Sequence, residues 1–194
     1  MYIKIHFYLF VFLAYVFYQG KLKLYLLFYL SAFVHETAHI VTALLLGVDL
    51  KELFLSPFGV NAKFSKRNME EHAILISVAG PLLSFFLAFF CKDRMVQTMN
   101  YCMAYFNMIP IYPLDGGRVL RAILELLLGK KGTRLSKMIS SFFLMTILFV
   151  MVFLAFYYRV YLALWLGAYL ILISLREAKK EKIIETIRYL QKDE

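Results

Sequence analysis

The sequence predicts an all-α membrane protein, a polytopic helical bundle of about six transmembrane helices. The 194 residues are 62% hydrophobic with a mean hydropathy of +0.69, far above the roughly 45–50% apolar content of a soluble domain. Several apolar stretches also approach the ~20 residues that a helix needs to cross a bilayer. The expected spans, in chain order, are residues 3–18, 24–47, 73–90, 96–112, 138–157 and 160–175.

The basic residues indicate how these spans are oriented. The formal net charge is +9, from 22 Lys and Arg against 13 Asp and Glu. If the N-terminus lies in the cytoplasm, most of the basic residues fall on the cytoplasmic side, in agreement with the positive-inside rule. We therefore expect a multi-pass protein of the cell membrane with both termini in the cytoplasm. Membrane orientation thus accounts for the distribution of the basic residues. The positive net charge is therefore not evidence for nucleic acid as a partner.

The chain is expected to form one intramembrane domain, residues 1–175, followed by a cytoplasmic amphipathic tail, residues 176–194. Between the second and third spans, residues 48–72 hold a short alternating apolar run that Pro57 and Gly59 interrupt. This pattern predicts a short membrane-dipping hairpin loop. Irregular backbone at membrane depth is tolerated where it lines a cavity or is covered by protein, so the loop is a candidate wall of a polar chamber.

Glycine and proline modify the third and fourth spans. The sequence AGP at residues 79–81 predicts a kink or a close helix contact inside the third span. Pro110 and Pro113 make a regular helix unfavourable, so the chain should unwind before Asp115 and restart as a helix near Arg118. The restarted helix is amphipathic and is expected to lie at the interface, followed by basic residues suited to anionic headgroups.

Three ionisable residues stand in the middle of the second span. His35 and His39 are four residues apart, so on an α-helix both imidazoles can reach one ion, and Glu36 can lie beside it. This H-E-x-x-H pattern is typical of two zinc ligands and a glutamate that takes a proton from water. A charged residue at a helix centre in the bilayer costs roughly 2.5–3.5 kcal/mol on insertion scales. A divalent cation would offset that cost.

A catalytic zinc usually has three protein ligands, so a third is expected elsewhere in the chain. Outside the flanking loops and the tail, the acids are Glu36, Asp115 and Glu125. Gly116 and Gly117 let the backbone turn the Asp115 carboxylate toward the bundle, although Asp-Gly is also a common turn signal. With the histidines in view, a metal ligand is the favoured role for Asp115, and Glu125, among arginines, is expected to be an ion-paired surface acid.

The motifs together resemble a known family, the site-2 protease class of intramembrane zinc metalloproteases, peptidase family M50. The residues that resemble it are HETAH at 35–39, AGP at 79–81 and NMIPIYPLDGG at 107–117, in the family's order and with similar spacing. The resemblance covers about residues 20–130. The compact layout and the short LSPFGV loop are most similar to the sporulation branch of the family.

The resemblance implies a site. It places zinc ligands at His35, His39 and Asp115, and the catalytic base at Glu36. It also implies that Asn107 lies near the Zn²⁺ and helps to hold the substrate or the oxyanion, although a helix-packing amide is an equal alternative. Many relatives have Leu-Gly between the glutamate and the second histidine, where this chain has Thr-Ala, and both are small enough to keep the helix.

The implied activity is that of a zinc metalloendopeptidase acting in regulated intramembrane proteolysis. It would hydrolyse membrane-associated protein substrates near the cytoplasmic face, such as a pro-sigma factor during sporulation, and a membrane-protein inhibitor or regulator is an expected partner. Several relatives in the sporulation branch continue into a nucleotide-sensing CBS domain, whereas the sequence given stops at Glu194, either as a naturally short member or as part of a longer chain, so the resemblance implies no nucleotide regulation for these residues. The alternatives are a divalent-metal transporter, which predicts several sites along a path, and a catalytically inactive membrane scaffold.

Overall fold

The computed structural model describes residues 2–5, 8–56, 59–64, 71–157 and 171. It is mostly helical, as predicted, but the all-α class is incomplete because a small sheet is present. The elements, in chain order, are β1 (Tyr2–Ile5), α1 (Tyr8–Tyr18), α2 (Leu22–Leu45), β2 (Leu50–Ser56), β3 (Gly59–Phe64), α3 (Ala73–Phe90), α4 (Arg94–Asn107), α5 (Asp115–Leu128) and α6 (Lys130–Tyr157).

Three helices among the described residues, α2, α3 and α6, are long and apolar enough to cross a membrane. The expected first span, 3–18, is wrong as a continuous helix, because it begins in β1 and leaves α1 with 11 residues. The expected fourth span, 96–112, ends early, because α4 stops at Asn107 after 14 residues. At 1.5 Å per residue these helices rise about 17 and 21 Å, short of a ~30 Å hydrocarbon core.

Two expectations fall largely outside the described part of the chain. The sixth span, 160–175, is described only at residue 171, and the tail at 176–194 is not described. The fifth span, 138–157, lies wholly within α6. The number of membrane crossings therefore stays a prediction.

The sheet forms where the sequence alternates apolar and polar residues. β2 pairs antiparallel with β3, and β1 adds to the other side of β2 in parallel, in the order β1-β2-β3. A parallel pair needs a long crossover, and here the crossover contains α1 and α2. The segment at 48–72 therefore includes two paired strands, while its depth in the membrane stays a prediction.

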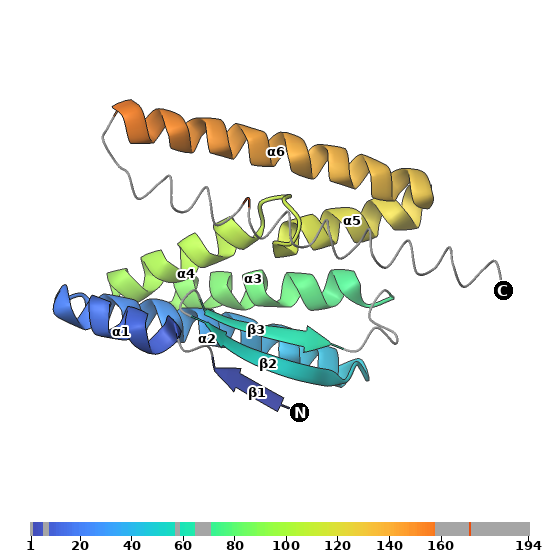
Figure 1. Ribbon diagram of the computed structural model, residues 1–194. Helices are drawn as coiled ribbons and strands as arrows, with labels where there is room; N and C mark the ends of the chain where they lie inside the picture. Colours follow the sequence, from blue (N-terminus) through green and yellow to red (C-terminus); the bar gives the residue numbers. More distant parts are fainter. Residues whose placement is uncertain (1, 6–7, 57–58, 65–70, 158–170, 172–194) are drawn as a thin grey trace.

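The helices pack around α3 (Figure 1), which contacts α2, α4 and α5, while α6 packs on α5 and β3 lies against α2. Small side chains allow these close contacts: Ala43, Ala88 and Ala104 are each 0% exposed, as expected where helices associate through small residues. Ala43, Val48 and Ile76 form the buried cluster where the end of α2 meets the start of α3. This packing places the middle of α2 beside α3 and the start of α5.

Candidate metal centre

The two histidines of α2 lie together as their spacing predicts. His35 and His39 are buried, and their rings meet edge to face with centroids 4.9 Å apart. Their Nε2 atoms are 3.2 Å apart. Both nitrogens therefore face the same small space on the side of α2 that packs against α3.

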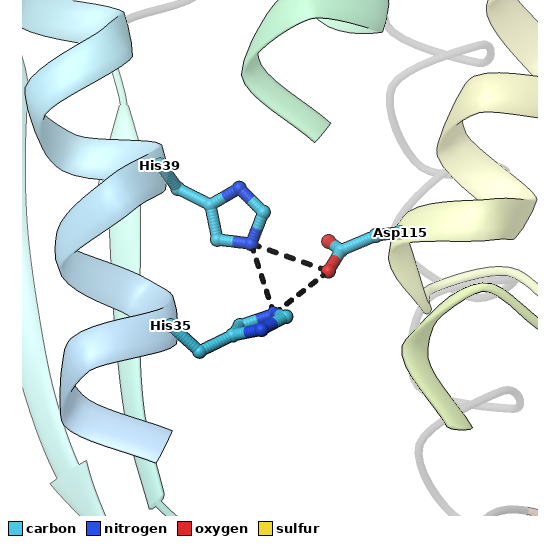
Figure 2. A group of neighbouring side chains, drawn as sticks. All are labelled: His35, His39 and Asp115. Atoms are coloured by element: carbon cyan, nitrogen blue, oxygen red, sulfur yellow. Dashed lines mark hydrogen bonds and ion pairs between the residues drawn. The ribbon is translucent and has the colours of Figure 1, made fainter. Parts of the chain in front are cut away.

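Asp115, 80 residues from His35 in the sequence, faces the same space from the first residue of α5. Figure 2 shows the three side chains converging, with Asp115 Oδ2 lying 3.1 Å from His35 Nε2 and 3.2 Å from His39 Nε2. Four tetrahedral donors about 2.0–2.1 Å from a zinc ion are separated by about 3.3–3.4 Å. The buried triangle of two imidazole nitrogens and one carboxylate oxygen therefore fits Zn²⁺ in both donor type and spacing.

The second nitrogen of each imidazole contacts α3. His39 Nδ1 lies 2.6 Å from the Ile76 carbonyl oxygen, and His35 Nδ1 lies 2.9 Å from Ser84 Oγ. A carbonyl oxygen only accepts, so His39 Nδ1 carries the proton and its Nε2 lone pair is free for a metal. Such partners orient metal-binding histidines in proteins generally.

Gly80 of α3 lies directly against the metal-facing nitrogens. A Cβ at this position would lie 2.3 Å from His39 Nε2 and 2.7 Å from His35 Nε2. The AGP motif is predicted from sequence only as a kink or a close helix contact, and Ser84 is not among the residues expected at the site. Serines at 77 and 84 flank Gly80 at helical spacing, and this polar stripe in an apolar span was the signal for a role beside the site.

The segment between α4 and α5 positions Asp115. It turns at residues 108–114, contains a cis peptide bond between Tyr112 and Pro113, and folds over the first turn of α5. The contact is close: a Cβ on Gly117 would lie 2.3 Å from the Ile111 carbonyl carbon. The unwinding before Asp115 is confirmed, but the helix restarts at Asp115 rather than near Arg118.

Electrostatics keep the Asp115 carboxyl ionised. Burial by itself would raise the pKa of Asp115, but the adjacent His35 and His39 rings, whose Nε2 atoms face its carboxyl group, outweigh it. Arg118 Nη1, 3.9 Å from Asp115 Oδ1, acts in the same direction. The pKa of Asp115 therefore lies well below its usual range, and the group is a carboxylate at neutral pH, the form that binds metals.

Glu36 stands beside this triangle and is held by the sheet. Its Oε1 accepts a hydrogen bond of 2.7 Å from the backbone nitrogen of Ala62 in β3. The group whose ligand atoms lie within 4.8 Å of one another consists of His35, His39 and Asp115, without Glu36. The geometry leaves Glu36 available as a base next to the candidate ligands.

The other two polar residues singled out in the sequence lie on α4 and α5. Asn107 closes α4, and its side-chain nitrogen donates 3.0 Å to the Met103 carbonyl of the same helix. Glu125 lies 3.7 Å from Arg121 on the exposed side of α5. The expectation of an ion-paired surface acid at Glu125 is confirmed.

Known proteins resemble this chain in sequence. Residues 94–152 match the model of peptidase family M50. Zinc metalloprotease MJ0392 of Methanocaldococcus jannaschii is 33% identical over 117 residues, which are 53% of this chain and 34% of that protein. Stage IV sporulation protein FB of Bacillus subtilis is 28% identical over 134 residues, 61% of this chain and 46% of that protein. The chain thus spans between about a third and a half of the length of these relatives.

A solved structure resembles the fold over nearly the whole chain. The site-2 protease from Methanocaldococcus jannaschii superposes with a TM-score of 0.67 at 25% sequence identity. The match covers 90% of this chain and 89% of that one. Together with the three apolar helices, these similarities show a membrane protein with a metalloprotease-like fold.

Proposed function

For this chain, which is related to the site-2 proteases of peptidase family M50, we propose the activity of an intramembrane zinc metalloprotease. The observation that supports it most directly is the convergence of His35, His39 and Asp115 on one buried point, with Glu36 alongside. The donors fit Zn²⁺, and the H-E-x-x-H arrangement supplies both ligands and base.

Each residue has a defined part in the proposed reaction. His35, His39 and Asp115 would hold the zinc ion. A zinc ion held there supplies a Lewis acid, which polarises a carbonyl oxygen and makes a water molecule acidic enough to react near neutral pH. Glu36 would act as the base that accepts a proton from the attacking water and passes it to the leaving amine. The hydrogen bond from Ala62 anchors one oxygen of Glu36 and leaves the other for the proton transfers.

The sheet suggests how a substrate is presented. Peptide carbonyls in a helical substrate are hydrogen-bonded, so the substrate must become extended before hydrolysis. β3 is an edge strand in the order β1-β2-β3, and its Ala62 N–H points to Glu36. An extended peptide added along this edge would lie beside the proposed base. We propose membrane-associated proteins, cut near the cytoplasmic face, as substrates.

Several finer features belong to the same proposal. The chain crosses the membrane several times with both termini in the cytoplasm, and the β2–β3 hairpin dips into the bilayer. Residues 1–175 form the protease domain and 176–194 a cytoplasmic tail. A pro-sigma factor is one candidate substrate, by analogy with the sporulation relative, and a membrane-protein regulator is a candidate partner. Asn107 would hold the substrate or the oxyanion.

A metal transporter is the main alternative. It would need several metal-binding groups along a path, whereas the described residues contain one such cluster. Zinc uptake into proteoliposomes that depends on His39 would support transport. Cleavage without zinc flux would support the protease.

The deciding experiment changes Glu36 alone. Glu36→Gln should retain wild-type zinc content but lose cleavage of a co-expressed membrane substrate by about 10²–10⁴-fold, the usual contribution of a general base. Glu125→Gln, the same chemical change at an exposed acid, is the control and should leave both unchanged. Full proteolysis by Glu36→Gln would refute the mechanism. Unchanged zinc content in both His39→Ala and Asp115→Asn would refute the ligand set.

A further inference from the structure

The corner where α5 meets α6 concentrates positive charge. The first eight residues of α6, 130–137, hold Lys130, Lys131, Arg134 and Lys137 and no acid. The side chains of the first three are exposed. Glu125, the last acid before them in the sequence, lies 3.7 Å from Arg121 on α5. This end of α6 therefore presents a local excess of cations.

The sequence of α6 places that corner at the membrane surface. Residues 138–157 contain no charged residue, and this stretch of α6 would rise about 30 Å, the thickness of the hydrocarbon core. Residues 130–137 extend the helix by about 12 Å more. When the apolar part fills the hydrocarbon layer, the four cations therefore lie at the level of the lipid headgroups.

The surface at this corner has a hollow with a cationic part and an apolar part. A hollow of about 300 Å³ is lined by Lys130, Lys131 and Arg134 together with Leu135 and Met138. The two apolar residues lie toward the hydrocarbon end of α6 and the cations toward its start. The end of α5 beside it exposes further apolar surface, with Leu126 81% and Leu127 70% exposed.

The corner is also firmly built. A Cβ on Gly132 would lie 1.8 Å from the Leu124 carbonyl oxygen, so α5 and α6 meet with their backbones in contact. The basic side chains thus stand on a rigid pair of helices rather than on a separate loop. A rigid arrangement lowers the entropy cost of holding a ligand.

We propose that this hollow binds one anionic phospholipid, with the headgroup phosphate between Lys130, Lys131 and Arg134 and the start of an acyl chain on Leu135 and Met138. Charge and apolar surface are matched to such a molecule, since it carries a phosphate and a hydrocarbon chain at these two levels. The inference rests on the membrane location of α6 and not on proteolysis.

The test measures lipid preference directly. The full chain in mixed detergent micelles with equal amounts of phosphatidylglycerol and phosphatidylcholine should retain phosphatidylglycerol in preference when analysed by native mass spectrometry. The triple variant Lys130→Gln, Lys131→Gln, Arg134→Gln should reduce this preference at least tenfold, because each cation at a membrane surface contributes about a fivefold factor. Zinc content and circular dichroism check that the variant is folded.

A second triple variant distinguishes lipid binding in this hollow from a general effect of the protein's net charge. Lys21→Gln, Lys23→Gln, Lys92→Gln removes the same charge at three other exposed positions and should keep the preference. Glycerol 3-phosphate, which lacks acyl chains, should not displace the bound lipid. Equal loss in both triple variants, no preference in the wild type, or displacement by glycerol 3-phosphate would each overturn the proposal. The lipid preference of the wild type, the preference of the two variants and the displacement by glycerol 3-phosphate are all measured independently of protease activity.

Discussion

Replacing Gly80 by alanine tests the site geometry most stringently, because two opposing effects are expected. In a helix interior, alanine is favoured over glycine by about 0.8–1.0 kcal/mol. The added methyl, however, would lie 2.3 Å from His39 Nε2, while ordinary contact begins at 3.4 Å. The ring would therefore have to retreat by about 1.1 Å, the difference between these distances.

That retreat is incompatible with metal binding. The opposite nitrogen of His39 is held at 2.6 Å by the Ile76 carbonyl, so the ring cannot slide away without breaking this hydrogen bond. His35 would also be displaced, because the same methyl would lie 2.7 Å from its Nε2. Metal–ligand distances tolerate only about ±0.2 Å. We expect Gly80→Ala to keep its helices but to lose zinc affinity.

The assay is zinc content after dialysis against a chelator of known affinity, with circular dichroism to verify the helices. Loss of one supporting contact around a metal site costs about 10–100-fold in affinity, so displacement of two ligands should cost at least about 100-fold. Leu82→Ala, two residues along α3 and 60% exposed, is the control and should bind zinc normally. Wild-type affinity in Gly80→Ala would refute the arrangement of α3 against the histidines.

Three further predictions concern the surroundings of the site. Ser84→Ala removes the hydroxyl at 2.9 Å from His35 Nδ1. Zinc affinity, measured by chelator competition, should fall by about 10–100-fold. An unchanged affinity would show that the hydroxyl does not orient the ring. Gly117→Ala places a methyl 2.3 Å from the Ile111 backbone. Overpacking of this kind lowers the free energy of unfolding by about 1–3 kcal/mol, so the Tm in detergent should fall. A Tm at or above that of the wild type would contradict the close contact between this turn and α5. Asn100 is 2% exposed, and its Oδ1 has no hydrogen-bond partner among the residues that the structure describes. Asn100→Leu combined with Ser31→Ala should therefore lower the free energy of unfolding by no more than about 1 kcal/mol. A much larger loss of stability would mean that this amide oxygen has a partner in solution, such as a water molecule.

The sheet shows where inference from sequence failed. Residues 3–18 are apolar apart from Lys4 and His6, and this short alternation at the start was too brief to separate a strand from the beginning of a helix. Tyr2–Ile5 becomes a strand because β2 offers it a parallel partner about fifty residues away, in the register Ile3 opposite Leu53. Pairing of this kind depends on distant residues, so local pattern does not reveal it.

Around the site, too, some features follow from local sequence and others depend on how the helices pack. The placement of both histidines on one face follows from helical periodicity, the expected span 24–47 lies close to α2 at Leu22–Leu45, and the interruption before Asp115 follows from two prolines. The contacts of Ser84, Gly80 and the Ile76 carbonyl with the histidines depend on how α3 lies against α2. The sequence shows that residues 80 and 84 are small and polar, respectively, but it does not show how far they lie from the imidazoles.

The clustering of His35, Glu36 and His39 on one part of a helix in an apolar chain can be deduced from sequence, because the α-helical repeat places residues four apart within about one turn of each other. Three features come from the packing of the helices and the sheet: a carboxylate 80 residues after His35 completes the triangle at 3.1 and 3.2 Å, a strand anchors Glu36, and a glycine of α3 lies against the ligand atoms. The reason is that helical repeat is a local property of the backbone, whereas distances between helices follow from packing side chains against one another across the whole fold.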